Sequence, residues 1–260
     1  MAGKDESIMK KTALITGASS GIGRDIARNL SKRGYNLVLV ARRAERLNEL
    51  KDELDTEVMP ITADLSKRSE CVRVYNATRK MNICVLVNCA GFGATGSFDS
   101  IELKRELEMI DVNVSSLHIL TKLFLHNFIK RDRGYILNVA SSAGLMRGGP
   151  MMATYYATKS YVVSLTNAIS QELKSSGSHV YIGSLCPGPV KTEFDDVANN
   201  KFSINGISSN ECADYAVEMM FRRKRIIIPG TMMKALCFVS KFSPLDIQLA
   251  ITEKIQKKKC

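Results

Sequence analysis

Hydrophobic and polar positions along the chain form two kinds of segment that follow one another in turn. Short apolar runs predict strands at 12–16, 36–40, 57–61, 83–88, 135–140, 180–186 and 225–229. Longer segments with apolar residues at helical spacing predict helices at 22–33, 43–54, 66–80, 102–130, 153–175 and 209–221. Strands that are apolar on both faces and separated by helices indicate a parallel sheet covered on both sides, because parallel neighbours need crossover connections. The pattern therefore predicts an α/β, doubly wound fold with about seven strands.

This pattern continues through the chain without a low-complexity linker, so we expect one domain over residues 1–260, with 231–260 as a C-terminal extension. The first residues include Asp5 and Glu6 and lack an apolar run, which is not typical of a secretory signal. No segment approaches the roughly 18 uninterrupted apolar residues of a membrane span. The seven cysteines are scattered and never spaced as Cys-x-x-Cys. We therefore expect reduced thiols, no metal site and a cytoplasmic protein.

The formal net charge of +11 is concentrated near the C-terminus. From residue 222 to residue 260 there are ten lysines and arginines against Asp246 and Glu253, a balance of +8. The chain has no nucleic-acid recognition motif and no platform of aromatic residues for stacking bases. We therefore predict no nucleic-acid partner.

The stretch "TGASSGIG" (16–23) follows the first predicted strand and opens the first predicted helix. Gly17 permits a tight turn, Gly21 lets backbone N–H groups approach a pyrophosphate, and Gly23 allows close helix packing. The N-terminus of the helix adds partial positive charge. Because strand, turn and helix occur in the required order, the stretch predicts a dinucleotide site.

The end of the second strand distinguishes the two nicotinamide dinucleotides. An acidic residue there usually binds a ribose 2′-hydroxyl, whereas a 2′-phosphate needs cationic donors and is repelled by a carboxylate. "LVLVARR" offers Ala41, Arg42 and Arg43. We therefore predict NADP(H), with Arg42 as the main phosphate ligand and Arg43 stacking on adenine or assisting. The alternative is that both arginines only solvate a helix start, where the helix dipole disfavours cations.

Further motifs follow in order: "NCAG" (88–91), "DVNVSS" (111–116), "NVASSAG" (138–144), Tyr155-x-x-x-Lys159 and "PGPVKT" (187–192). With the Gly-x-x-x-Gly-x-Gly spacing, they make residues 10–230 strongly resemble the short-chain dehydrogenase/reductase family. The resemblance implies a Rossmann-type sheet, hydride transfer to or from a nicotinamide, and a homodimer or homotetramer. It implies these cofactor contacts besides the two arginines: Gly17, Ser19, Ser20, Gly21, Ile22, Gly23, Asp64, Leu65, Asn88, Ala90, Gly91, Tyr155, Lys159, Pro187, Gly188, Val190 and Thr192.

Two of these positions have a second interpretation, and one neighbouring residue departs from the family pattern. Asp64, matched to an adenine contact, is equally suited to capping a helix, and so is Thr192, which the resemblance assigns to the nicotinamide carboxamide. Cys89 stands where the family usually has asparagine, and we expect its small thiol to pack rather than to do redox chemistry. Asn88 and Gly91 keep the residues expected to brace the sheet and approach the cofactor.

Two tyrosines precede a lysine in "ATYYATKS" (153–160). Reduction of a carbonyl by hydride requires a proton donor, and a nearby ammonium makes tyrosine suitable by lowering its pKa from about 10. Tyr155 lies four residues and Tyr156 three residues before Lys159, and both spacings bring side chains together on a helix. Geometry therefore leaves the choice open. The resemblance selects Tyr155 and leaves Tyr156 as a packing residue.

The resemblance assigns three further catalytic roles. Lys159 also holds the nicotinamide ribose, and Asn113 helps a water molecule relay protons to that lysine. The substrate oxygen is bound by the serine thirteen residues before the tyrosine, which is Ser142. Ser141 would then face the cofactor or end the strand.

The sequence thus predicts an NADPH-dependent carbonyl reductase that also works as an alcohol dehydrogenase. The alternative is a regulatory protein that senses NADP(H) without turnover, although a sensor would not need the proton donor. Reduction of 3-oxoacyl groups and oxidation of hydroxysteroids both stay open, because the fold does not choose a substrate. The segment after the sixth strand contains Phe194, Phe202, Ile204 and Ile207. These residues suit a hydrophobic substrate or the packing of a lid.

The C-terminal extension combines apolar clusters with a basic end. Met232, Met233, Leu236 and Val239 recur at helical spacing, with lysines on the other side, which indicates an amphipathic helix. Such a helix could lie on an anionic membrane. The alternative is that the extension packs across the substrate cleft or a subunit interface and leaves lysines 257–259 solvated. Because Pro244 divides the apolar clusters, we favour this second interpretation.

Overall fold

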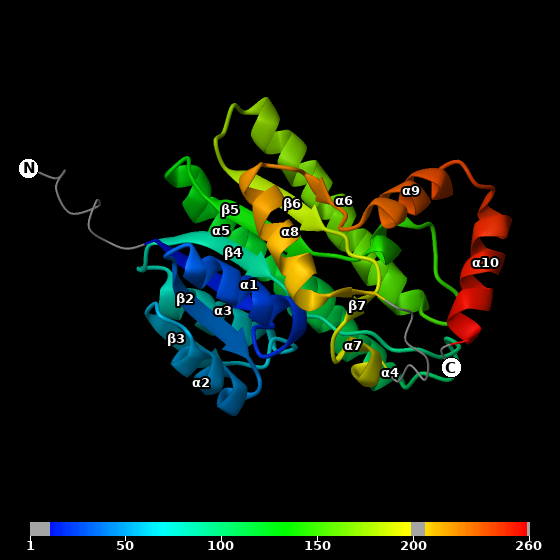
Figure 1. The fold of residues 1–260 in the computed structure, drawn as a ribbon, viewed down its shortest axis with the longest axis horizontal. Helices are drawn as coiled ribbons and strands as arrows, with labels where there is room; N and C mark the ends of the chain where they lie inside the picture. The colour runs from blue at the N-terminus through cyan, green and yellow to red at the C-terminus, as the bar shows by residue number, and fades with distance from the viewer. Residues whose placement is uncertain (1–10, 199–205, 259–260) are drawn as a thin grey trace, which may run out of the picture.

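The computed structural model describes residues 11–198 and 206–258, in which a seven-stranded parallel sheet forms the centre (Figure 1). The strand order is β3-β2-β1-β4-β5-β6-β9. The strands are β1 (Thr12–Thr16), β2 (Asn36–Ala41), β3 (Val58–Thr62), β4 (Ile83–Asn88), β5 (Tyr135–Val139), β6 (Tyr181–Leu185) and β9 (Ile226–Ile227). All six pairings between them are parallel, so the predicted doubly wound fold is confirmed.

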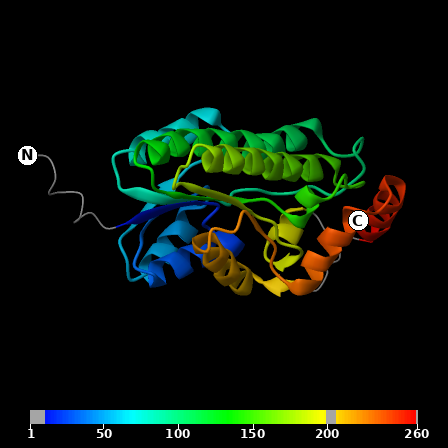
Figure 2. The ribbon, with the colours of Figure 1, turned by 90° about the horizontal axis from the view of Figure 1, so that it is seen from above.

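Helices cover both faces of the sheet (Figure 2). One face carries α1 (Gly21–Lys32), α2 (Ala44–Glu53) and α8 (Ser209–Phe221), and the other carries α3 (Arg68–Thr78), α5 (Leu117–Lys130) and α6 (Ala153–Ser175). Successive strand residues alternate between the two cores. In β1, Ala13 and Ile15 belong to the core under α1, whereas Leu14 belongs to the core under α5. The strands are apolar on both faces for this reason.

The helix predicted over 102–130 consists of three elements. These are α4 (Leu103–Ile110), the π-helical segment η1 (Asp111–Ser116) and α5. The apolar pattern did not reveal this change in helical pitch, which falls on the predicted catalytic Asn113. A π-helical turn at that place is typical of functional sites.

Several short elements after β5 and β6 were not predicted, because two to four residues are too few to form a pattern. They are η2 (Ser142–Leu145), β7 (Val190–Lys191), α7 (Phe194–Val197) and β8 (Ile207–Ser208). The two strands among them pair with each other in a separate small sheet. Phe202 and Ile204, which were considered as lid residues, lie outside the described residues.

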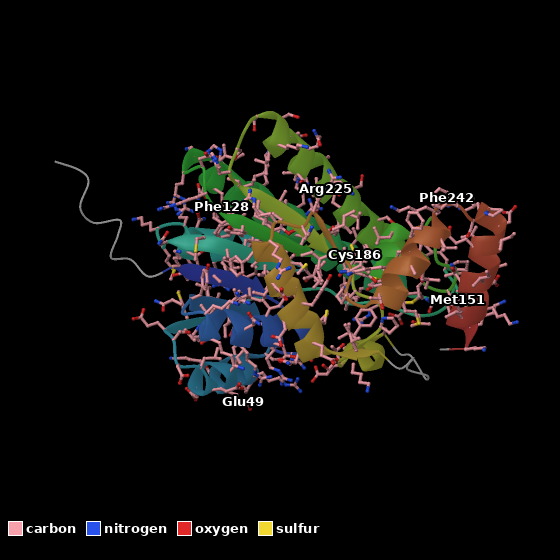
Figure 3. All side chains as sticks on the ribbon, turned by 45° about the horizontal axis from the view of Figure 1, so that its top comes forward. Glu49, Phe128, Met151, Cys186, Arg225 and Phe242 are labelled. Atoms are coloured by element: carbon pink, nitrogen blue, oxygen red, sulfur yellow. The ribbon has the colours of Figure 1, made fainter. Side chains whose placement is uncertain are left out.

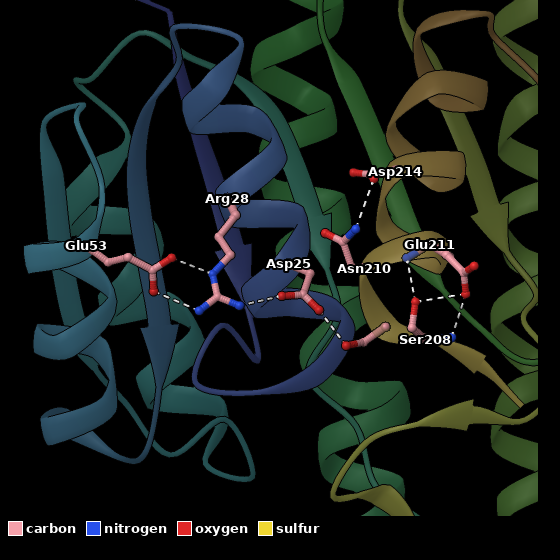
Figure 4. Close-up of polar contacts among 8 residues, drawn as sticks. Asp25, Arg28, Glu53, Ser208, Asn210, Glu211 and Asp214 are labelled. Carbon is pink, nitrogen blue, oxygen red and sulfur yellow. Dashed lines mark hydrogen bonds and ion pairs between the residues drawn. The ribbon is translucent and has the colours of Figure 1, made fainter.

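A buried carboxylate joins the helices of the first face (Figure 4). Asp25 of α1 accepts a hydrogen bond from Arg28 Nη1 at 2.7 Å and another from the hydroxyl of Ser209 in α8. Arg28 also binds both carboxylate oxygens of Glu53 in α2, each at 2.7 Å. Because a buried charge needs partners, these bonds fix the relative positions of α1, α2 and α8.

Two C-terminal helices lie outside the layers, at the end of the molecule toward which the strands run (Figures 1 and 2). They are α9 (Thr231–Ser240) and α10 (Leu245–Lys257), and Pro244 stands at the start of the second. Met232, Leu236 and Val239 fall within α9, as the apolar spacing predicted. None of the helices in the described part of the chain is long and apolar enough to span a membrane.

Candidate active site

A cavity of about 680 Å³ lies at the carboxyl ends of the strands. Its walls come from the loops that follow β1, β2, β4, β5 and β6, and from the inner sides of α9 and α10. Successive crossovers diverge between β1 and β4, which is where ligands bind in open parallel sheets. All the predicted site residues line the cavity except Asn88 and Asn113, which are buried behind its wall.

The glycines of the glycine-rich turn stand where a side chain has no room. Gly17 has a φ of +68°, and a Cβ there would lie 2.8 Å from the backbone nitrogen of Ala90. A Cβ on Gly23 would lie 2.4 Å from the carbonyl oxygen of Gly17. Ser20 precedes α1 without a side-chain cap, and no acidic residue occupies the first turn. The first N–H groups of the helix are therefore suited to an anion, and the turn fits a pyrophosphate.

Arginines border the cavity at the end of β2, where positions 41–43 hold no acidic residue. Arg42 is exposed at the rim. Arg43 donates from Nη2 to Ser20 Oγ at 2.9 Å and to Ser19 Oγ at 3.1 Å. Its Nη1 donates to Glu193 Oε2 at 2.8 Å. Arg43 thus joins the glycine-rich turn to the segment after β7.

Glu193 is a site residue that the sequence interpretation missed. Its carboxylate also binds the guanidinium of Arg46, and hydrogen bonds from Arg46 and Arg43 lower its pKa to about 2. The only sequence signal was its position directly after Thr192. A carboxylate therefore holds one of the two arginines predicted to bind the 2′-phosphate.

Neither Asp64 nor Thr192 occupies the N-cap position of a helix. Asp64 Oδ1 accepts hydrogen bonds from Ser66 N at 3.2 Å and Ser66 Oγ at 2.8 Å, whereas Lys67 occupies the cap position of α3. Asp64 is therefore not a helix cap. Thr192 Oγ1 accepts from the backbone N–H of Phe194 at 3.2 Å, but Glu193 stands between Thr192 and the first residue of α7, so Thr192 closes a turn before the helix and is not its N-cap. Thr192 also faces Gly21, since a Cβ there would lie 2.9 Å from its Cγ2.

Asn88 braces the sheet behind the cavity. Its Nδ2 donates to Thr121 Oγ1 and to Asn138 Oδ1, both at 2.9 Å. Asn138 in turn donates to Thr166 Oγ1 at 3.0 Å, so the network joins β4 and β5 to α5 and α6. The neighbouring Cys89 is a poor redox group, because burial raises its pKa to about 12.

Tyr155 and Lys159 lie together on the buried side of α6. Lys159 Nζ is 5.8 Å from the centroid of the Tyr155 ring and donates to the carbonyl oxygen of Val139 at 3.0 Å. Burial lowers the pKa of Lys159 to about 8. The cavity wall therefore holds a phenol beside an amine that is protonated at neutral pH.

Tyr156 has a different setting. Its hydroxyl accepts a hydrogen bond from Gln256 Nε2 of α10 at 3.0 Å, and burial raises its pKa. Its ring packs against Gly149, where a Cβ would lie 2.3 Å away. Tyr156 therefore anchors the C-terminal helix to α6.

The two serines also differ. Ser141 Oγ accepts from the backbone N–H of Ala143 at 3.1 Å and so caps η2. The backbone N–H of Ser142 donates to the carbonyl oxygen of Pro187 at 2.8 Å. This bond fixes Ser142 beside the loop after β6. The hydroxyl that caps η2 belongs to Ser141, not to Ser142.

Asn113 binds the loop after β4 through both ends of its amide. Its Oδ1 accepts from Phe92 N at 3.0 Å, and its Nδ2 donates to Phe92 O at 2.9 Å and to Thr158 Oγ1 at 3.1 Å. A Cβ on Gly91 would lie 3.0 Å from Asn113 Oδ1 and 3.2 Å from Lys159 Nζ. Asn113 and Lys159 therefore flank Gly91, while the proton relay through water stays a prediction.

Comparison with known proteins identifies the family. A model of the short chain dehydrogenase family matches residues 11–202 of the 260. The chain belongs to the short-chain dehydrogenase/reductase family. A curated relative, the 3-oxoacyl-[acyl-carrier-protein] reductase of Rickettsia prowazekii, is 32% identical over 74% of this chain and 77% of its own.

Solved structures of this family carry either nicotinamide cofactor. A short-chain dehydrogenase from Sphingobium yanoikuyae in complex with NADPH has a TM-score of 0.80 and 30% identity, covering 89% of this chain and 94% of its own. A short-chain dehydrogenase/reductase from Burkholderia phymatum in complex with NAD has a TM-score of 0.83 and 25% identity, covering 93% and 96%. The protein is therefore an oxidoreductase of this family that uses a nicotinamide dinucleotide.

The C-terminal helices of this short-chain dehydrogenase contribute residues that the motifs did not reveal. Gln248 Oε1 accepts from Arg147 Nε at 3.1 Å, and its Nε2 is buried without a hydrogen-bond partner among the described residues. Gln248, Thr252 and Gln256 form the buried side of α10 and line the cavity. Their spacing of four residues was visible in the sequence, but nothing indicated that a polar stripe would face inward.

Proposed function

We propose that this short-chain dehydrogenase uses NADPH to interconvert a carbonyl and an alcohol, with Tyr155 as the general acid and base. The observation that carries the proposal is the buried pair of Tyr155 and Lys159 at the wall of a cavity that also contains the glycine-rich turn. A regulatory protein that only binds the dinucleotide has no need for this pair.

The end of β2 supports NADP(H). Ala41 is the last residue of the strand, and Arg42 and Arg43 follow it. In our proposal Arg42 binds the 2′-phosphate and Arg43 assists, because both are cations in a position where NAD-dependent proteins usually have an acid. Solved relatives carry either NADPH or NAD, so they do not select one of the two cofactors. The preference for NADPH in our proposal rests on the residues of this chain.

The bound nicotinamide supplies the hydride in reduction and accepts it in oxidation. Tyr155 donates its phenolic proton to the oxygen that becomes the alcohol, and Ser142 donates a hydrogen bond to the same oxygen. Below a pH of about 8, Lys159 is charged. Its ammonium, 5.8 Å from the centre of the Tyr155 ring, stabilises the phenolate that forms when the proton leaves. The carbonyl oxygen of Val139 accepts a hydrogen bond from the amine and keeps it in place.

The substrate side of the cavity supports a hydrophobic carbonyl compound. Met233, Leu236, Val239 and Ile251 of the C-terminal helices line it. The resemblance to a 3-oxoacyl reductase adds 3-oxoacyl thioesters to the ketones and aldehydes worth testing, and hydroxysteroids are the matching test in the oxidative direction. Assembly as a homodimer or homotetramer and a cytoplasmic location stay predictions.

The test is a screen of ketones, aldehydes, 3-oxoacyl thioesters and hydroxysteroids with NADP(H) and NAD(H). We expect turnover of at least one hydrophobic carbonyl compound, with a higher kcat/KM for NADPH than for NADH. Arg42→Asp should weaken NADPH use and leave NADH use unchanged or improved. A higher kcat/KM with NADH would contradict the cofactor assignment. NADPH binding without turnover of any substrate class would favour the sensor.

A further inference from the structure

The helix α10 buries its polar side and exposes its apolar side, the reverse of an ordinary surface helix. Its buried stripe is polar and consists of Gln248, Thr252 and Gln256. The adjacent stripe of Ile247, Ile251 and Ile255 is exposed, with 56% of Ile251 accessible. A surface helix of a globular protein normally turns its apolar stripe inward and its polar stripe toward water.

Specific bonds hold α10 in this orientation. Gln256 Nε2 donates to Tyr156 Oη at 3.0 Å, and Arg147 Nε donates to Gln248 Oε1 at 3.1 Å. The guanidinium of Arg147 also binds the carbonyl oxygen of Ser243, just before the helix. The body of the protein therefore fixes the polar stripe inward, and the apolar stripe is left outside.

The apolar surface continues along α9. Met232 is 81% exposed, Phe238 62% and Phe242 75%, and the two phenylalanine rings contact each other with centroids 5.2 Å apart. Figure 3 shows Phe242 at the end of the molecule formed by α9 and α10, far from Cys186 in the interior. The exposed apolar residues of the two helices and of the turn between them are Met232, Leu236, Phe238, Val239, Phe242, Leu245, Ile247, Ile251 and Ile255, which we call the C-terminal apolar surface. A set of this size marks an interaction site rather than scattered surface residues.

The positive charge around this surface favours an anionic partner. Residues 231–258 contain five lysines against Asp246 and Glu253, a balance of +3. Lys254 and Lys258 are exposed on the same side of α10 as the isoleucines, and Glu253 is paired with Lys257 at 2.6 Å. A second copy would bring like charges together, whereas anionic headgroups are complementary to them. Long lysine side chains also keep their charge at the headgroup level while their stems lie along apolar surface.

The surface is continuous with the mouth of the cavity. Leu236, Val239, Ile251 and Ile255 are exposed and also line the cavity. The two helices do line the cavity, as the interpretation favoured from the sequence expected, but this packing leaves their outer apolar side uncovered. We propose that the C-terminal apolar surface docks on an anionic lipid bilayer, so that the cavity opens toward the lipid. Docking is independent of the reaction, so its test does not depend on the proposed function. It uses burial of apolar side chains together with attraction of lysines, and no helix crosses the bilayer.

The test is cosedimentation of the full-length protein with phosphatidylcholine vesicles that either contain or lack phosphatidylserine. We expect binding to the anionic vesicles that weakens as salt is added, because the lysine contribution is screened. The variant Phe238→Ser/Phe242→Ser should lose binding at least about tenfold, since two large apolar side chains no longer enter the lipid. The control Val72→Ser/Ile129→Ser changes two exposed apolar residues of α3 and α5 and should bind like the wild type.

A second pair of variants tests the contribution of the lysines to vesicle binding. Lys254→Gln/Lys258→Gln should weaken binding by about tenfold or more, because each lysine near the surface contributes about 1 kcal/mol. Lys130→Gln/Lys174→Gln removes the same charge from α5 and α6 and should have little effect. Circular dichroism and unchanged urea unfolding confirm that all variants fold.

Three results would overturn the proposal. One is the absence of binding to anionic vesicles at low salt. Another is equal loss of binding in the test and control variants. The third is a stable dimer in analytical ultracentrifugation that Phe238→Ser/Phe242→Ser dissociates, without vesicle binding by the wild type. In that case a second copy covers the C-terminal apolar surface.

Discussion

The helices α1 and α10 border opposite ends of one cavity and bury opposite kinds of residue. In α1 the apolar residues Ile26 and Leu30 are fully buried against the sheet. In α10 the polar residues Gln248 and Gln256 are buried and the isoleucines are exposed. Both sequences have an amphipathic pattern, and both form helices. An amphipathic pattern therefore predicts a helix, but the surface against which the helix packs determines which of its sides is buried.

The glycine-rich turn, at the α1 end of the cavity, should tolerate substitution least. Two glycine variants, one at each end of the cavity, test this contrast. A Cβ on Gly23 would lie 2.4 Å from the carbonyl oxygen of Gly17, and backbone there must move to accept it. We expect Gly23→Ala to weaken NADPH binding by about a thousandfold, or ~4 kcal/mol, because the pyrophosphate cradle is displaced. Calorimetric titration of NADPH measures this effect.

Gly148 provides the matched substitution beside α10. A Cβ there would lie 3.0 Å from the flexible end of the Leu249 side chain, which is able to shift. NADPH affinity of Gly148→Ala should stay within about threefold of the wild type, which corresponds to less than ~1 kcal/mol. Equal losses of NADPH affinity in Gly23→Ala and Gly148→Ala would mean that the two ends of the cavity tolerate an added Cβ equally well.

Stability measurements test the two helices directly. Ile26 is 0% exposed, so Ile26→Ala should lower the free energy of unfolding by about 3 kcal/mol through lost burial and a cavity. Ile251 is 56% exposed, and Ile251→Ala should change it by no more than about 0.5 kcal/mol. Urea unfolding gives both values. A large loss for Ile251→Ala would show that its side chain is covered in solution.

The buried amine of the catalytic wall should make stability depend on pH. Because burial lowers the pKa of Lys159 to about 8, the folded protein loses this proton before the unfolded chain does. The unfolded state then binds more protons between about pH 8 and 10, so this group makes stability rise with pH in that window. Lys159→Met lacks this contribution. The melting temperature of the wild type relative to Lys159→Met should therefore rise from pH 7 to pH 10, and a constant difference would contradict the lowered pKa.

A small gain in affinity is expected from a change at Glu193, at the rim of the cavity. Its carboxylate binds Arg43 at 2.8 Å and would compete with a 2′-phosphate for that arginine. Both side chains are about two-fifths exposed, which limits the effect to about 1 kcal/mol. Glu193→Gln should therefore tighten NADPH binding a few-fold without changing NADH binding. Dissociation constants for both cofactors decide the matter, and equal changes for both would exclude competition at the 2′-phosphate.

Much of the fold and site was predictable because the signals are local. The apolar runs placed the strands of the sheet to within one or two residues, and the Gly17 to Gly23 turn and the Tyr155 and Lys159 pair are contiguous motifs. Glu193 escaped prediction because its role depends on Arg43, 150 positions earlier in the chain. The inward polar stripe of α10 escaped because it depends on contacts with Tyr156 and Arg147, which local spacing does not reveal.

The comparison of Tyr155→Phe with Tyr156→Phe tests the central claim most directly. We expect Tyr155→Phe to keep its fold and its NADPH affinity but to lose carbonyl reduction by about a thousandfold, because the proton donor is removed. Tyr156→Phe loses only the hydrogen bond from Gln256. It should keep turnover within several-fold and lose about 1 kcal/mol of stability. Near-normal single-turnover reduction by Tyr155→Phe, with loss in Tyr156→Phe, would contradict the account.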